Sequence, residues 1–184
     1  MAGLICLLTW LSGGFEEDPS VAIKEQLDEH NGHLDAYLRV ARQVAGPENN
    51  ARPRGPFAVV TLATNSRNIG DSTRDLYALD PIMTKLPASA LPQNGERAKT
   101  LVSLHFGQQH VAGYEGGAKA MRETCAVRVF DMDSELLIRR RDFVGGEPPP
   151  SITSYGSSSY GDHYGTGVDD QLIHFIESLI VSAN

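Results

Sequence analysis

Four side chains in the second half of the chain are of the types that acid–base hydrolysis uses. They are His105, Asp131, Asp162 and His163. A histidine that acts as a base needs an acid to orient it, and adjacent residues such as Asp162 and His163 cannot orient each other in that way. A catalytic set would have to be assembled by folding, so the sequence by itself assigns no catalytic residue.

Metal and phosphate motifs are incomplete. His30 and His33 stand three residues apart beside Glu29 and Asp35, a spacing at which two imidazoles can bind one metal ion. No cysteine or third histidine completes the set nearby, so a solvated helix face is the favoured interpretation. Residues 113–119 are rich in glycine but lack the G-x-x-x-x-G-K-[ST] spacing of a phosphate loop. The sequence therefore predicts no metal site and no cofactor.

Cysteine chemistry is not indicated either. The chain has two cysteines, Cys6 and Cys125, which is too few for a disulfide framework. Cys6 lies in an apolar run, and no signature of a Cys-His nucleophile surrounds Cys125. We expect both to be buried or membrane-embedded thiols.

Three consecutive arginines, Arg139, Arg140 and Arg141, form the clearest cationic feature. In a strand their side chains alternate between two faces, so Arg139 and Arg141 share one face. Salt bridges or a solvated surface are the favoured interpretation, and an anion or carboxylate site is the alternative.

The charge of the chain argues against nucleic acid as a partner. The formal net charge is -7, and residues 1–50 carry eight acidic and three basic side chains. A surface of this sign repels phosphates. The partner class that we expect is protein.

The first 14 residues have the character of an anchor or signal segment. Residues 2–11 are apolar except for Thr9, a run shorter than the roughly 20 residues that a transmembrane helix needs. Small residues follow at positions 12–14, as in a secretory signal, although no basic residue precedes Lys24. We expect a membrane-anchored or exported protein with its domain outside the cytoplasm. The alternative is a cytoplasmic protein in which this run is a buried helix or strand.

A helix is predicted for residues 20–45. Its apolar stripe comprises Ile23, Leu27, Leu34, Leu38, Ala41 and Ala45. Asn31 and Gly32 interrupt the pattern and are expected to kink or split the helix. Residues 46–56 have the composition of a loop. We therefore assign residues 15–50 to a helical juxtamembrane region and residues 51–184 to the main domain.

Alternating and β-branched segments predict a sheet in the main domain. Residues 57–63 have the composition of a buried strand. In residues 100–106, alternation places Val102, Leu104 and Phe106 on one face and Leu101, Ser103 and His105 on the other. Residues 125–132 and 135–145 flank Asp133 and Ser134, which predicts a hairpin. Three prolines between residues 76 and 92 predict short extended chain there.

A second helix is predicted at the C-terminus. Thr166 and Asp169 have the spacing of a capping pair. The apolar stripe that follows consists of Val168, Leu172, Phe175, Ile176 and Leu179. The predicted fold is therefore α+β, a mostly antiparallel sheet of about four or five strands covered by this helix, with the N-terminal helix beside or below it.

A stretch rich in tyrosine, serine and glycine precedes that helix at residues 154–167. It has too little aliphatic content to pack a core of its own. We interpret it as a surface crossing that returns the chain to the sheet, with contact to a partner as the alternative.

Residues 75–184 resemble a domain that recurs in uncharacterised bacterial proteins, many of which carry an N-terminal signal or membrane segment. The resemblance depends on Val102, Leu104, Gly113, Tyr114, Thr124, Cys125, Val127, Val129, Asp131, Phe143, Gly145, Gly146, Glu147, Pro148 and Pro149. It implies a protein at the membrane or beyond it, and it brings no assigned activity.

The favoured function is that of a non-enzymatic envelope domain that binds a protein or another ligand. No Ser/His/Asp, metal or phosphate motif has a working spacing. A hydrolase with a site assembled by folding and a subunit of a larger complex are the two alternatives.

Overall fold

The computed structural model describes residues 31–43, 46–62, 79–114, 117–151 and 161–183. The apolar segment 1–14 and the first part of the predicted N-terminal helix lie outside the described residues. So do residues 152–160 of the tyrosine- and glycine-rich stretch. No helix among the described residues is long and apolar enough to cross a bilayer.

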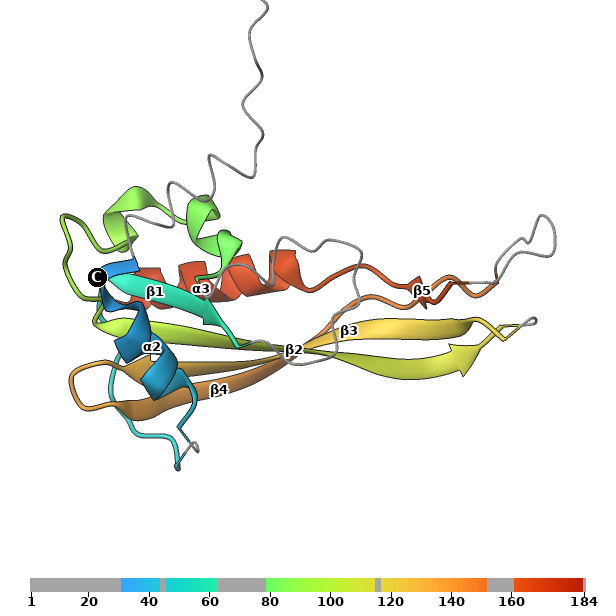
Figure 1. The fold of residues 1–184 in the computed structure, drawn as a ribbon, viewed down its shortest axis with the longest axis horizontal. Coiled ribbons are helices and arrows are strands. Elements are labelled where there is room, and N and C mark those ends of the chain that lie inside the picture. Colours follow the sequence, from blue (N-terminus) through green and yellow to red (C-terminus); the bar gives the residue numbers. More distant parts are fainter. Residues whose placement is uncertain (1–30, 44–45, 63–78, 115–116, 152–160, 184) are drawn as a thin grey trace, which may run out of the picture.

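One mixed sheet of five strands forms the centre of the fold, in the order β1-β2-β3-β4, with β5 also paired to β3. The strands are β1 (Phe57–Thr61), β2 (Thr100–Gly113), β3 (Lys119–Asp131), β4 (Leu136–Val144) and β5 (His163–Tyr164). β2, β3 and β4 are antiparallel neighbours, whereas β1 runs parallel to β2 and β5 parallel to β3. The α+β prediction with a mostly antiparallel sheet is confirmed (Figure 1).

Helices cover both faces of the sheet. α3 (Asp169–Ala183) packs on the face of Phe106 and Phe143, because the ring of Phe143 lies 5.5 Å from that of Phe175. α2 (Leu34–Ala41), preceded by the 3₁₀ turn η1 (Asn31–His33), packs against β1, β2 and β3 and lies in front of the sheet in Figure 1. Two covered faces explain why every residue from Thr100 to Leu104 is buried.

The buried side of α2 differs from the predicted stripe. Tyr37, Val40 and Ala41 are fully buried, whereas Leu34 and Leu38 are only partly so. Tyr37 lies inside because its hydroxyl accepts a hydrogen bond from the amide of Ala98 at 2.8 Å. The buried residues of α2 belong to the same hydrophobic core as those of the sheet.

The proline-rich segment after β1 is helical rather than extended. It forms two 3₁₀ helices, η3 (Pro81–Lys85) and η4 (Ala88–Ala90). The fully buried carboxylate of Asp80 begins η3, accepting hydrogen bonds from the amide of Ile82 and the hydroxyl of Thr61. Proline at the first position of such a turn loses no intrahelical bond, which is why the expectation of extended chain was wrong.

The C-terminal helix begins at Asp169, after the predicted capping residue Thr166. The amide of Val168 donates instead to the Glu123 carboxylate at 3.0 Å, so a side chain of β3 satisfies a donor at the helix start. The predicted stripe is confirmed, because all five of its residues are buried. His174 lies on the exposed side of the helix.

Candidate functional site

The four residues proposed for a hydrolase lie at three separate positions along β3. Asp131 ends that strand, His105 pairs with Ala126, and His163 pairs with Ala120. At about 3.4 Å per residue, Asp131 and Ala126 are roughly 17 Å apart, and Ala126 and Ala120 roughly 20 Å. The structure therefore brings neither Asp131 to a histidine of this set nor His105 to an aspartate of it, and Asp162 and His163 are together only as sequence neighbours.

His105 does have a serine beside it. Ser103 Oγ lies 3.1 Å from His105 Nε2 on the face of the sheet opposite α3. Ser103 is fully buried, so its hydroxyl is closed to a substrate. Burial, aided by the positive charge of Arg128, lowers the pKa of His105 below 6.5. No carboxylate among the described residues bonds to this imidazole, so the pair is a buried polar contact without the third member of a triad.

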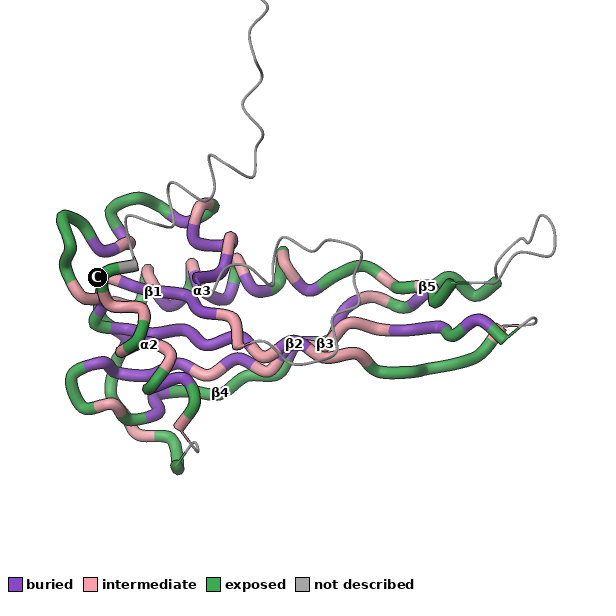
Figure 2. The backbone as a smooth tube through the Cα atoms, in the orientation of Figure 1, coloured by how far each residue is buried: buried purple, intermediate pink, exposed green. Residues whose placement is uncertain are grey.

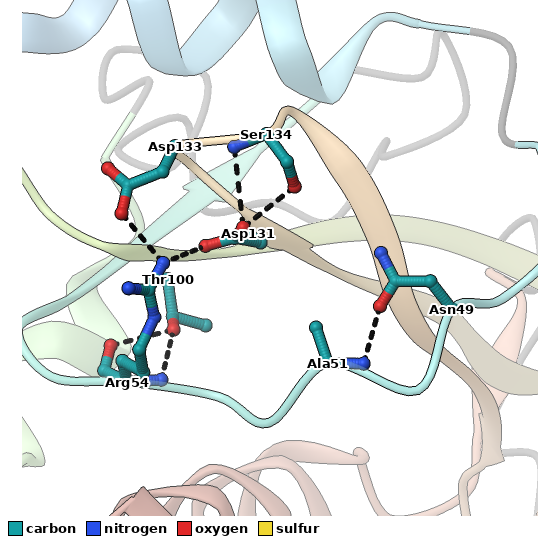
Figure 3. A network of polar contacts seen from close by, with 7 residues as sticks. All are labelled: Asn49, Ala51, Arg54, Thr100, Asp131, Asp133 and Ser134. Atoms are coloured by element: carbon teal, nitrogen blue, oxygen red, sulfur yellow. Dashed lines mark hydrogen bonds and ion pairs between the residues drawn. The ribbon is translucent and has the colours of Figure 1, made fainter.

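Asp131 is held in a structural network that Figure 3 shows. Its Oδ1 lies 2.6 Å from Nη2 of Arg54, and its Oδ2 accepts a 2.7 Å bond from the hydroxyl of Ser134. Burial alone would raise the pKa of Asp131, but the bonds from Ser134 and Arg54 outweigh burial and lower it. Arg54 also reaches Asp133 at 2.7 Å, and its backbone exchanges two hydrogen bonds with the hydroxyl of Thr100. The network fastens the loop before β1 to the β3–β4 turn.

The metal site considered at His30 and His33 has no support in the described residues. His33 Nε2 lies 3.0 Å from the carbonyl oxygen of Gly95. No group of three or more histidine, cysteine or acidic side chains that could hold a metal ion occurs in the part of the chain that the structure describes. His30 and Glu29 lie outside that part.

The three arginines of β4 alternate as predicted. Arg139 pairs with Val129 and Arg141 with Val127, on the face that α3 covers, while Arg140 pairs with Arg128 on the other face. The guanidinium of Arg141 lies over the Phe143 and Phe175 rings, at 5.1 and 5.5 Å from their centroids. Arg141 is thus committed to the α3 packing, whereas Arg139 is not.

The sequence did not predict a long arm formed by the β2–β3 hairpin. β1 pairs with β2 only as far as Leu104, and β4 pairs with β3 only from Thr124 onward. Beyond these points the hairpin continues to Gly113 and Lys119 with β5 beside β3 (Figure 1). We call residues 107–113, 119–123 and β5 the arm. Figure 2 shows that its β2 side is mostly exposed, whereas β2 is buried from Thr100 to Leu104.

One edge of the arm has backbone groups without a partner among the described residues. The carbonyl of Leu104 accepts from the amide of Leu62, so the Leu104 backbone faces β1 rather than β3. Alternation along a strand turns Gln108 and His110 the same way. Beyond Leu62 no described strand lies on that side of β2. The N–H and C=O groups of Gln108 and His110 therefore face an edge where no described strand pairs with them.

The base of the arm is fixed by close packing of backbones. The amide of Gly146 donates to the carbonyl of Thr166 at 2.8 Å, and that of Gly165 to Met121 at 3.2 Å. A Cβ atom on Gly165 would overlap the carbonyl of Gly146, so only glycine fits there. A Cβ atom on Gly145 or Gly146 would overlap Thr166, which explains the Gly-Gly pair before Glu147.

Tyr114 contacts two other segments at the outer end of the arm. The hydroxyl of Tyr114 donates to the Pro149 carbonyl at 2.5 Å, and the Tyr114 ring meets that of His163 edge-on at 5.5 Å. Asp162, which precedes His163 in the sequence, accepts a hydrogen bond from the amide of Lys119 at 3.3 Å. Both members of the pair thus have structural contacts in the arm.

Comparison with known proteins adds no assignment to these observations. The resemblance to a domain of uncharacterised bacterial proteins stays a prediction. No protein-family model, no curated protein and no solved structure matches the chain.

Proposed function

We propose that this chain is a non-enzymatic interaction module that binds a partner protein along the β2 edge of its arm. The observation that carries the proposal is the outward-facing backbone of Gln108 and His110, which has no strand partner in the described part of the chain and lies where β2 continues beyond the core. An extended peptide can add to such an edge as a further strand, with main-chain hydrogen bonds providing affinity.

The side chains of this edge suit strand addition. Sheet edges without a partner strand are commonly protected by lysine, proline, a β-bulge or short length. Residues 107–113 contain no lysine, arginine, acid or proline. The one irregularity is a bulge between His110 and Ala112, which leaves Val111 37% exposed. An uncharged strand with an exposed valine favours a protein over a charged polymer as the occupant.

The hydrolase alternative has less support. Ser103 is fully buried, and His105, Asp131 and His163 are separated along β3. A nucleophile needs access to substrate and a base oriented by a third group. The alternative of a complex subunit is compatible with the proposal, because strand addition would be the contact that joins the subunits.

We also propose that the module works outside the cytoplasm, attached or exported through the N-terminal segment. The support is the apolar run at residues 2–11 followed by small residues. Membrane fractionation combined with protease accessibility of a C-terminally tagged full chain tests this. Digestion of the tag from outside is expected, and a tag that stays protected in the cytoplasm would contradict the location.

Photo-cross-linking tests the arm. A photo-reactive amino acid is placed at exposed His110 and, as a control, at exposed Asp170 on α3 in the full chain. Irradiation in the native cell is expected to give a defined protein adduct from position 110 that is absent from position 170. Mass spectrometry distinguishes a different protein from a second copy of this chain.

Two proline variants then separate binding from folding. In Gln108→Pro the lost N–H faces away from β3, so the hairpin keeps its ladder while a bound strand loses a donor. In Gln109→Pro the lost N–H faces β3, so the hairpin itself is weakened. We expect the first variant to keep its melting temperature and lose the adduct. An adduct undiminished in a folded Gln108→Pro protein would rule out strand addition at this edge.

A further inference from the structure

A polar cleft of about 450 Å³ lies at the opposite end of the sheet from the arm. Its walls are the loop of residues 48–53, Ile138 and Arg139 of β4, and Ser182 in the last turn of α3. This cleft is independent of the β2 edge, because it borders β4 where that strand pairs with Val129.

The loop that forms one wall is fastened at both ends. At its start, the amide of Arg140 donates to the Glu48 carboxylate at 2.8 Å, and the amide of Asn49 to the Leu137 carbonyl at 2.9 Å. At its end, Arg54 holds Thr100 and Asp131 (Figure 3).

Within the loop, the amide of Ala51 donates to the side chain of Asn49 at 2.7 Å, also seen in Figure 3. The wall therefore keeps its shape before any ligand arrives, which lowers the entropic cost of binding.

Two arginines, Arg52 and Arg139, line the cleft. Neither has a carboxylate partner among the described residues, whereas Arg39, Arg54 and Arg122 each have one. A guanidinium offers paired N–H donors in a fork that matches a carboxylate or phosphate.

Glu48 adds a negatively charged residue to the lining of the cleft. One of its carboxylate oxygens accepts the Arg140 amide, and Glu48 is among the residues that line the cleft. Two arginines and one glutamate leave an excess of one positive charge, which suits a monoanion better than a phosphate dianion. The Glu48 carboxylate would repel the anionic end of the ligand and attract a hydrogen-bond donor beside that end.

We infer that the cleft binds the carboxylate group of a small organic acid or of a peptide C-terminus, with an N–H or O–H donor next to that group. Arg52 and Arg139 bind the carboxylate, and Glu48 accepts from the neighbouring donor. The site takes a ligand class different from that of the arm, and it does not depend on the arm being an interaction site.

A different role for the arginines is structural. α3 has no basic residue in its last turn, and the C-terminal end of a helix is stabilised by nearby positive charge. If Arg52 and Arg139 only serve that end, their replacement lowers stability and no carboxylate responds to the change.

The test is an amide NMR titration of the full chain with four probes: acetate, glycolate, glycine and inorganic phosphate. A triglycine peptide with a free or an amidated C-terminus extends the series and distinguishes a small acid from a peptide end. The expected result is saturable shifts at residues 50–52, 138 and 139, strongest for probes with both a carboxylate and a donor. The amidated peptide should produce none.

Arg140→Gln provides a matched control, because it removes the same charge from the neighbouring residue on the opposite face of the sheet. Arg139→Gln is expected to weaken the best probe at least about tenfold, with Arg140→Gln near the wild-type affinity. Arg139→Lys keeps the charge but not the paired N–H donors of the guanidinium, so its affinity for the probe should lie between those of the two glutamine variants.

Three outcomes would overturn the inference. One is an absence of saturable shifts at the cleft with every probe in the folded protein. Another is an equal loss of affinity in the Arg139→Gln and Arg140→Gln variants. The third is a loss of stability in Arg139→Gln with no change in the response to the probes, which would assign the arginine to the end of α3.

Discussion

Arg54 and Asp131 are 77 residues apart in sequence, and Nη2 of Arg54 lies 2.6 Å from Oδ1 of Asp131. The contact joins the loop before β1 to the end of β3. The Asp131 side chain is 12% exposed, whereas that of Asp133, which meets the same nitrogen, is 62% exposed. The two aspartates therefore offer a matched pair for measuring the contact.

Asp131→Asn is expected to lower the free energy of unfolding by about 1–2 kcal/mol, because a partly buried charge-assisted bond is lost. Asp133→Asn is expected to change it by less than about 0.5 kcal/mol, since that carboxylate is solvated. Urea unfolding of both variants at neutral pH measures the difference. Equal effects of the two substitutions would contradict the account of this network.

The contribution of Asp131 depends on pH in a defined direction. Its folded-state pKa lies below 3.8, so the carboxylate stabilises the fold above that pH and loses this effect as pH falls through the folded value. The stability difference between wild type and Asp131→Asn should therefore be constant near neutral pH and shrink below about pH 3.8. Urea unfolding at a series of pH values tests this, and a difference that stays constant into the acid range would refute it.

His105 is expected to titrate below its ordinary pKa of 6.5, because burial disfavours the imidazolium. The unfolded chain then binds the proton more readily, so the fold loses stability as pH falls from 6.5 through the folded value. NMR titration measures the pKa, and His105→Gln should remove this part of the pH dependence. A pKa at or above 6.5 would show that the imidazole is solvated.

Gly165 should not tolerate a side chain. Its Cβ would overlap the Gly146 carbonyl, which is backbone and cannot rotate away. We expect Gly165→Ala to cost about 1–3 kcal/mol of stability. Gly161→Ala is the control, because a Cβ there meets nothing within 4 Å. Thermal unfolding compares the two variants, and equal melting temperatures would mean that the backbones at the arm base are not in contact.

Much of the central fold could be predicted from local periodicity. The alternation of Val102, Leu104 and Phe106 identifies a strand whose faces both lie in the core. The stripe from Val168 to Leu179 identifies the inner face of α3. In α3 the side-chain pattern and the final burial have the same period. In β2 the alternation identifies the strand, but both of its faces are buried from Thr100 to Leu104.

The arm could not be predicted in the same way. Gly107 and Gly113 indicate a loop by composition, yet both belong to β2, because β3 supplies partners along the whole hairpin. Pairing between strands is non-local. The pairing of β1 with β2 ends at Thr61 and Leu104, and among the described residues no other strand continues along that edge of β2. The candidate binding edge depends on where neighbouring strands stop, and no residue type in β2 records that.

The charged contacts also could not be predicted from the local sequence. Asp131 appeared as a candidate base, but its partner Arg54 is distant in sequence. In contrast, the alternation of Arg139, Arg140 and Arg141 was correct, because it follows from strand geometry alone. The cleft beside Arg139 required the loop of residues 48–53 to be placed against β4.

The central claim is that the β2 edge of the arm binds a partner strand, and amide hydrogen exchange at Gln108, Gln109 and His110 tests it most directly. In the free protein, Gln108 and His110 should exchange fast and Gln109 slowly, because only the Gln109 amide faces β3. Adding the partner identified by cross-linking should slow Gln108 and His110 at least about tenfold, as expected when an exposed amide gains a hydrogen bond. Unchanged exchange at both residues, with the partner bound and protection found elsewhere, would contradict the claim.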